Sequence, residues 1–173
     1  MNRIAKFCKV SFEQFVVDMN KIGFLDVDRL REIYDNIQLP TRKTKRAAGY
    51  DFIAPYPFVV DKNETVLIPT GIRCEIEGDW FLNILPRSGQ GFKNHVRLAN
   101  TCGVIDADYF GAPNEGHIMV KLINGDVSKL SVNAGDGFAQ GIFLPFGVTV
   151  DDENDDKMDR VGGFGSTSVS QTY

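Results

Sequence analysis

The sequence predicts an all-β sandwich or barrel with a short helical segment near its N-terminus. After Pro40, short apolar segments alternate with Gly, Pro, Asn and Asp, which is the pattern of regularly spaced short strands. Helices do not alternate with these strands, so an α/β sheet is disfavoured. The clearest candidate strands are 65–76, 80–86, 117–123 and 138–145.

The N-terminal part combines one strand with two helices. Residues 3–10 are short and apolar and are expected to form a first strand. Ser11 and Gln14 have the spacing of a capping box, in which each side chain bonds the other residue's backbone N–H. That helix should stop at Gly23, and a second amphipathic helix should run from about Asp26 until Pro40 ends it. The helices of 11–38 are expected to pack on the core or on a neighbouring subunit, with partner binding as the alternative.

Composition limits the classes of function. The length of 173 residues suits one domain, and 43% hydrophobic and 24% charged residues are usual for a globular protein. A net charge of −4 argues against a duplex nucleic-acid binder, although a compact anion needs only a few local cations. No apolar stretch approaches the roughly 20 residues of a membrane span, and no secretory leader is apparent. Three cysteines and two histidines lack zinc spacing, so a soluble cytoplasmic protein with reduced thiols is expected.

The C-terminal part of the chain differs from the rest in amino-acid composition. Residues 151–159 contain six acidic residues and are expected to form a solvated linker. Residues 160–173 are rich in Gly, Ser and Thr, so alone they should be mobile.

Five motifs carry the residues suited to chemistry. They are 47–51 (AAGYD), 86–89 (PRSG), 100–111 (NTCGVIDADYFG), 135–140 (GDGFAQ) and 160–167 (RVGGFGST).

Residue types in three of these motifs suit an anion and a hydrolytic step. Arg-Ser-Gly after a strand offers a guanidinium, a hydroxyl and accessible backbone N–H groups to a phosphate. The motif 160–167 also combines an arginine, glycines and hydroxyl side chains, and it adds Phe164, which can stack on a flat ring. Asp106 follows two apolar residues and should be half-buried, as a structural acceptor or as a base.

In their order along the chain, the five motifs resemble those of the trimeric dUTPase family, from Leu39 to Thr167. The resemblance implies a jelly-roll-like distorted β-barrel and one domain over 1–173, with 11–38 as an insertion. It also implies a homotrimer with shared active sites that cleaves dUTP to dUMP and pyrophosphate.

Within motif three, the resemblance assigns Asp106 as the base that activates the attacking water. Tyr109 would pack under the deoxyribose and leave no room for a 2′-hydroxyl. A hairpin around 100–105 would read uracil and exclude thymine and cytosine, with Met119 near the substrate on the following strand. The substrate-contacting positions of that hairpin are Asn100, Gly103, Val104 and Ile105.

The other motifs would bind the phosphates and close the site. Gln140 would lie near the α-phosphate, and Asp51 would support the catalytic arrangement. Mg²⁺ would be held by the triphosphate and water, without a direct protein ligand. The phosphate cradle is Arg87, Ser88 and Gly89, and the arm that closes over a neighbouring subunit's site is Arg160, Phe164, Gly165, Ser166 and Thr167.

Three departures from the family pattern stand out. Gly137 occupies a position that is often basic in motif four, and motif five is one residue shorter between Arg160 and Phe164. Residues 112–117 lengthen the stretch after motif three and are expected to reshape the pocket rim.

Two alternative functions are compatible with parts of the sequence. A dCTP deaminase shares this fold but uses a Glu on the strand after motif three, where this chain has Lys121. A dUTPase that doubles as a regulatory protein would use 11–38, or the basic run 42–46, as a contact surface.

Overall fold

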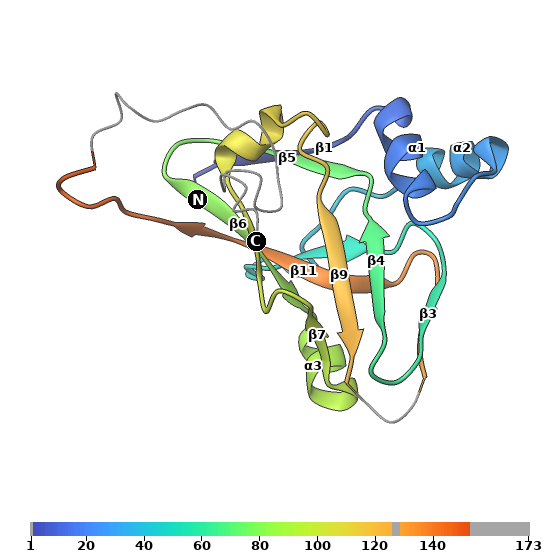
Figure 1. The fold of residues 1–173 in the computed structure, drawn as a ribbon. Coiled ribbons are helices and arrows are strands. Elements are labelled where there is room, and N and C mark those ends of the chain that lie inside the picture. Colours follow the sequence, from blue (N-terminus) through green and yellow to red (C-terminus); the bar gives the residue numbers. More distant parts are fainter. Residues whose placement is uncertain (1, 126–128, 153–173) are drawn as a thin grey trace, which may run out of the picture.

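The computed structural model describes residues 2–125 and 129–152, in which antiparallel strands form a barrel-like β-fold (Figure 1). A four-stranded sheet has the order β2-β11-β6-β8, and a three-stranded sheet has the order β4-β9-β7. Two strand pairs, β1-β5 and β10-β3, complete the described fold. This architecture confirms the predicted all-β, jelly-roll-like fold class. The strands are β1 (Ala5–Lys9), β2 (Tyr50–Ile53), β3 (Phe58–Val60), β4 (Thr65–Pro69), β5 (Ile72–Ile76), β6 (Trp80–Pro86), β7 (Val96–Leu98), β8 (Gly103–Ile105), β9 (Met119–Asn124), β10 (Leu130–Val132) and β11 (Gly137–Pro145).

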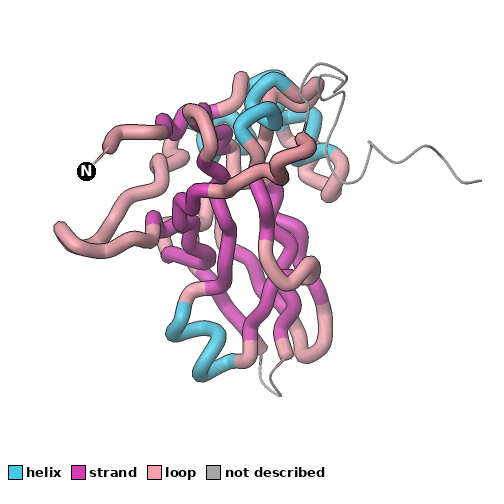
Figure 2. The backbone as a smooth tube through the Cα atoms, turned by 90° about the vertical axis from the view of Figure 1, so that its left-hand side faces the viewer, coloured by secondary structure: helices cyan, strands magenta, loops and turns pink. Residues whose placement is uncertain are grey.

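The helices lie at opposite ends of the strands. Both views place α1 (Phe12–Asn20) and α2 (Val27–Asp35) at one end, and α3 (Ser88–Asn94) at the other (Figures 1 and 2). A 3-10 helix, η1, covers Ala107–Gly111. No helix in the described part of the chain is long and apolar enough to cross a membrane.

Capping side chains start the two N-terminal helices where the sequence predicts. The Oγ of Ser11 accepts from the N–H of Gln14 at 3.1 Å, and Asp26 caps α2 in the same way. The reciprocal half of the expected capping box is wrong. The side chain of Gln14 donates to Asp18 at 2.7 Å, because the N–H of Ser11 already donates to Glu115 from a distant loop.

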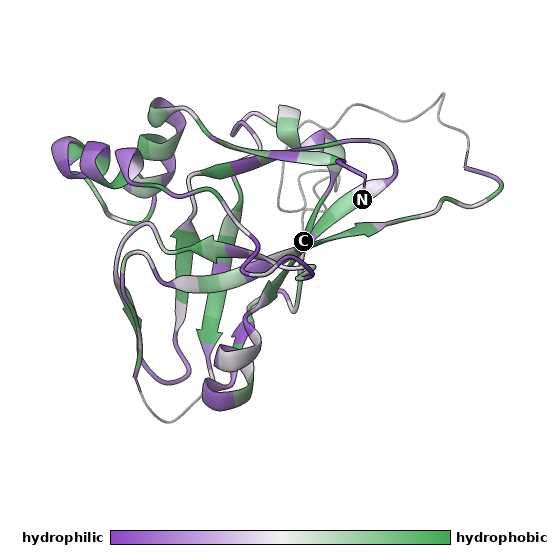
Figure 3. Ribbon diagram, turned by 180° about the vertical axis from the view of Figure 1, so that it is seen from behind, coloured by the Kyte–Doolittle hydropathy of each residue, from purple (hydrophilic) through white to green (hydrophobic). Residues whose placement is uncertain are grey.

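The N-terminal helices share one hydrophobic core with the barrel. Phe15, Met19 and Leu30 are fully buried and belong to the same cluster as Phe52 and Phe138. In Figure 3 the barrel strands are largely hydrophobic, whereas much of α2 is hydrophilic. The expected packing of this segment on the core is therefore confirmed.

The segment 65–76, expected as one strand, is two strands in different sheets. β4 pairs with β9, whereas β5 pairs with β1, and the chain changes direction at Thr70 and Gly71. Gly71 adopts φ +72°, which L side chains rarely adopt. Pro69 and Gly71 are turn-forming residues within this run, but they do not reveal that the two halves pair in different sheets.

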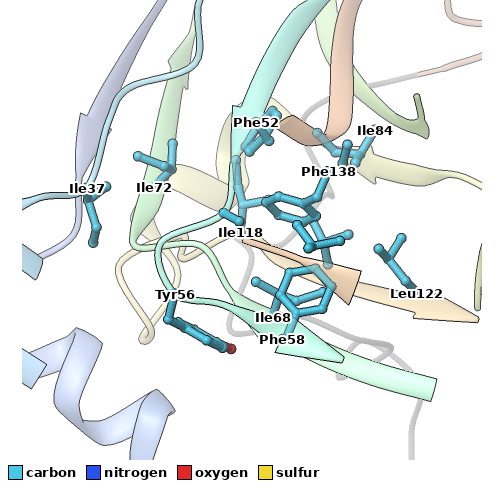
Figure 4. Packing of buried hydrophobic residues seen from close by; sticks show 14 of the residues in the cluster. Ile37, Phe52, Tyr56, Phe58, Ile68, Ile72, Ile84, Ile118, Leu122 and Phe138 are labelled. Atoms are coloured by element: carbon cyan, nitrogen blue, oxygen red, sulfur yellow. The ribbon is translucent and has the colours of Figure 1, made fainter. Parts of the chain in front are cut away.

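Gly71 is the point where the N-terminal helices meet the barrel. Its carbonyl accepts from the N–H of Val10 at 3.0 Å, and its N–H donates to Nε2 of His117 at 2.7 Å. A Cβ at this position would overlap Cδ1 of Ile37 and lie 3.5 Å from Phe15. Figure 4 shows Ile37 beside Ile72 at this edge of the core.

We expect Gly71→Ala to lower the free energy of unfolding by about 3 kcal/mol, from a strained backbone plus an overlap with Ile37. Chemical denaturation measures this. Gly78→Ala is the matched control, because Gly78 has φ +57° and no atom within 4 Å of an added Cβ. It should cost only about 1 kcal/mol.

The overlap is separable from the backbone strain. Ile37→Val removes Cδ1, so Gly71→Ala should cost about 1 kcal/mol less in that background than in the natural chain. Equal costs in both backgrounds would show that Ile37 does not set the requirement for glycine.

Candidate functional site

Four of the five sequence motifs lie on adjacent strands of the four-stranded sheet. Motif one enters β2, motif four enters β11, motif two follows β6, and motif three contains β8. Gln140 of β11 is opposite Asp51 on one side and Leu85 on the other. Antiparallel pairing therefore brings motifs one, two and four to one place, although they are far apart in the sequence.

Arg87 is held by two of these motifs. Its Nη1 donates to the carbonyl oxygen of Gly137 at 2.9 Å, and its Nη2 lies 3.4 Å from Oδ2 of Asp51. Asp51 is buried, and this oxygen accepts no hydrogen bond within the described residues, so the contact is an ion pair only. The guanidinium is thus oriented by motifs one and four.

Gly137 gives the guanidinium its space. A Cβ at this position would lie 3.0 Å from Nη1 and 3.1 Å from Cζ of Arg87. A Cβ here would therefore press the Arg87 guanidinium aside by a few tenths of an ångström, which favours glycine at this position.

Gln140 closes the contact between motifs one and two. Its Nε2 donates to the carbonyl oxygen of Pro86 at 3.1 Å. Its Oε1 lies so close to Gly49 that a Cβ there would approach it to 2.7 Å. The Gln140 amide is thus held by the hydrogen bond from its nitrogen to Pro86, and its oxygen occupies the space left by the missing side chain of Gly49.

Ser88 and Gly89 begin α3, a helix that the sequence analysis did not predict. Both residues are exposed, and a Cβ on Gly89 would meet no atom within 4 Å. The first N–H groups of a helix lack partners within it, so these two backbone groups are available to an anion. A shallow depression of about 470 Å³ adjoins them, lined by Pro86, Arg87, Ser88, Gly91, Phe92 and His95.

Phe92 is a site-lining residue that the sequence analysis missed. Its side chain is 90% exposed, which is unusual for a phenylalanine. It stands four positions after Ser88, on the same helix face, but the Gly-rich stretch around it gave no sign of a helix.

Motif three forms a tight turn followed by β8. Thr101 has φ +68° and forms a single bridge with Leu98, and the N–H of Cys102 donates to the carbonyl of Asn100 at 2.7 Å. The expected hairpin is only partly present, because the flanking strands pair elsewhere: β7 with β9, and β8 with β6. Asn100 and Val104 are exposed, Gly103 is buried, and Ile105 and Met119 are half-buried.

Asp106 and Tyr109 follow β8. Asp106 is half-buried, as the sequence predicts, and immediately precedes the 3-10 helix. Tyr109 is only 5% exposed. Its hydroxyl donates to the carbonyl oxygen of His117 at 2.9 Å and accepts from Nδ2 of Asn114 at 2.8 Å. The ring is therefore fixed by the lengthened stretch after motif three.

The structure does not bring Asp106 close to the residues of the same chain that are expected to bind phosphate. Ile105 pairs with Leu82 near the start of β6, whereas Arg87 follows the end of β6. At about 3.3 Å per residue, this register separates Asp106 from Arg87 by roughly 15–20 Å. Gln140 lies across β6 from β8. The expected site residues therefore form two clusters at opposite ends of one strand.

Two further expectations concern metals and the C-terminal arm. Among the residues that the structure describes, no three His, Cys, Asp or Glu side chains group in a way that would hold a metal ion. Residues 153–173 lie outside the described range, and with them Arg160, Phe164, Gly165, Ser166 and Thr167.

Comparison with known proteins gives consistent matches. The family model described as dUTPase matches residues 35–168. A deoxyuridine 5′-triphosphate nucleotidohydrolase of Lactococcus lactis is 39% identical over 134 residues, covering 77% of this chain and 89% of the relative. A protein of the same name from Glaesserella parasuis is 41% identical over 118 residues, covering 66% and 75%.

Solved structures agree. The dUTPase of Streptococcus mutans superposes with a TM-score of 0.63 at 30% identity, covering 83% of this chain and 97% of that one. The dUTPase of Staphylococcus bacteriophage 80alpha with dUPNHPP also has a TM-score of 0.63, at 19% identity, covering 97% and 100%. At that identity the second match shows the fold alone.

The contact between Gly137 and Arg87 predicts an effect on anion binding. Gly137→Ala should displace the guanidinium and weaken the binding of inorganic pyrophosphate about tenfold, the size expected for a hydrogen bond to a charged group. Calorimetric titration measures the Kd. Gly147→Ala is the control, since an added Cβ there meets no atom within 4 Å. Equal Kd values for both variants would contradict the role given to Gly137.

Proposed function

The chain belongs to the dUTPase family, and from this premise we propose that it hydrolyses dUTP to dUMP and pyrophosphate. One observation carries the proposal beyond the family match. Arg87, Asp51 and Gln140, from three motifs, meet at the junction of β2, β11 and β6 within the matched region.

Asp106 is proposed to act as the general base. Its carboxylate takes a proton from a water molecule, whose oxygen attacks the α-phosphorus in line while the bond to the pyrophosphate oxygen breaks. The half-buried position after β8 supports this role, because partial burial keeps a carboxylate from being fully hydrated.

Tyr109 and the turn at 100–105 are proposed to select the nucleoside. A ring packed under the deoxyribose leaves no space for a 2′-hydroxyl, and the burial and bonding of Tyr109 support such a fixed surface. The backbone of the turn, with Asn100, Gly103, Val104 and Ile105, would read the uracil edge. Met119 at the start of β9 would complete this end of the pocket.

Arg87, Ser88 and Gly89 are proposed to bind the phosphates, with Gln140 near the α-phosphate. The guanidinium and the first N–H groups of α3 supply positive potential beside the depression. The arm residues Arg160, Phe164, Gly165, Ser166 and Thr167 would close over the bound nucleotide and exclude water.

Mg²⁺ is proposed as the cofactor, bound to the triphosphate oxygens and water. The buried Oδ2 of Asp51 supports this arrangement, because within the described residues it still has capacity to accept a hydrogen bond. Asp51 would then hold a metal-bound water next to Arg87. When bound, the ion neutralises charge on the triphosphate.

A homotrimer with shared sites is proposed because one chain separates the two clusters. Asp106 and Arg87 lie at opposite ends of β6, yet both would act around the same triphosphate. Motif three of one subunit facing the phosphate cradle of another resolves this separation. The exposed Phe92 beside the cradle is then covered by the neighbouring subunit. A cytoplasmic location is proposed together with this assembly.

The substrate and the base are tested with one assay. Pyrophosphate release should be seen with dUTP and be far weaker with dCTP, dTTP and UTP. Asp106→Asn should still bind a non-hydrolysable dUTP analogue but turn over at least about 100-fold more slowly, the usual contribution of a general base. Equal turnover of all four nucleotides would refute the substrate, and unchanged turnover of the variant would refute the base.

Sharing of the site is tested by mixing two inactive variants. Asp106→Ala and Arg87→Ala chains, unfolded and refolded together in equal amounts, should regain about a quarter of the natural activity, because random assembly pairs the intact halves in that fraction of interfaces. Each variant refolded alone is the control. A site made within one chain predicts no recovery on mixing.

A further inference from the structure

We propose that helix α1 sets the sugar selectivity of the site, with Asp18 and Glu115 as positioning residues that fix Tyr109 from outside the pocket. The proposal rests on the role given above to Tyr109. It concerns side chains to which no part of the proposed reaction assigns a role, and α1 lies outside the residues that the family model matches.

The first link is a hydrogen bond between α1 and the stretch that follows Tyr109. His117 is fully buried, and its Nδ1 lies 2.7 Å from Oδ2 of Asp18. Its Nε2 accepts the backbone N–H of Gly71 at 2.7 Å, so that nitrogen carries no proton. The ring proton is therefore on Nδ1 and is donated to Asp18.

Asp18 is a rigid acceptor for this bond. It is 1% exposed, and its carboxylate also accepts from Nε2 of Gln14 and Nζ of Lys21, each at 2.7 Å. Burial raises the pKa of Asp18, but the hydrogen bonds from His117, Lys21 and Gln14 outweigh it and lower the pKa to about 2. The ionised carboxylate thus has three donors and little freedom to rotate.

His117 passes this constraint directly to Tyr109. The carbonyl oxygen of His117 accepts the hydroxyl of Tyr109 at 2.9 Å, and the N–H of His117 donates to the carbonyl of Asn114. Nδ2 of Asn114 in turn donates to the same hydroxyl at 2.8 Å. The position of the Tyr109 ring therefore depends on where α1 holds His117.

A second link joins the start of α1 to the same stretch. The N–H and Oγ of Ser11 both donate to the carboxylate of Glu115, at 2.7 and 2.5 Å. Arg73 lies 3.8 Å from the same carboxylate and donates to the carbonyl of Phe110, next to Tyr109. Gly116 packs on the backbone of Tyr109 so closely that only glycine fits.

The network between α1 and Tyr109 contains buried charged and polar groups in addition to the apolar contacts of the helix. Buried charged and polar networks seldom stabilise a fold more than apolar packing of the same volume, but they fix geometry. Rejecting a single 2′-hydroxyl needs a surface fixed to within a fraction of an ångström, and small displacements of a positioned group have large kinetic effects. The network ends on the one residue that needs this precision.

The test is the ratio of kcat/KM for dUTP to that for UTP. Asp18→Ala should lower this ratio about tenfold, mainly through a lower KM for UTP, with kcat for dUTP changed less than about twofold. Asp18→Asn keeps an acceptor for His117 and should stay within about threefold of the natural ratio. Glu32→Ala is the matched control, since it removes an exposed ion pair with Arg29 on α2 and should leave the ratio unchanged.

Glu115→Ala keeps the test decisive if Asp18→Ala does not fold. Its carboxylate is partly exposed, so Ser11 can bond to water instead, and the ratio should fall about threefold. If the natural enzyme favours dUTP and either variant folds with an unchanged ratio, the coupling between α1 and Tyr109 is refuted. If the natural enzyme turns over dUTP and UTP equally, Tyr109 does not exclude the 2′-hydroxyl. That result would refute the proposed role of Tyr109 and, with it, this inference.

Discussion

The antiparallel register of β6 between β11 and β8 determines what the rest of the molecule can do. On one side it holds Gln140 and, through β2, Asp51 against the end of β6 where Arg87 emerges. On the other it ends β8 beside Leu82, so Asp106 emerges at the far end. Leu82, which pairs with the residue before Asp106, is five positions before Arg87. Because successive residues are about 3.3 Å apart, Asp106 and Arg87 are too far apart for their side chains to meet.

Features that depend on residue type and on near neighbours in the sequence were predicted correctly. Features that depend on contacts between distant residues were not. Ser11 and Asp26 marked helix starts because their caps are local. The second half of the capping box failed because Glu115, about a hundred positions away, took the N–H of Ser11. The break at Gly71 was missed because it follows from pairing with β1 on one side and β9 on the other, and these strands are far away in the sequence.

The same division holds for the site. The five motifs identified the family because each is a compact set of chemical groups, and Arg87, Gln140 and Asp51 do meet as expected. His117 lacks zinc-site spacing, and its neighbours in the sequence suggest no other role for it. Its partner Asp18 is 99 residues away, so no local spacing reveals the pair. Helix α3 was not predicted because its Gly-rich sequence favours a loop. The shortest strands were not predicted because three residues are too few to show the alternation of apolar and polar positions.

The separation of Asp106 from Arg87 along β6 also bears on abundance. If sites are completed only between copies, as proposed, a chain at low concentration has no complete active site. Turnover per chain would then fall steeply once the concentration drops below that needed for assembly, rather than staying constant. The amount of protein in the cell would act as a switch on the reaction, without any effector molecule.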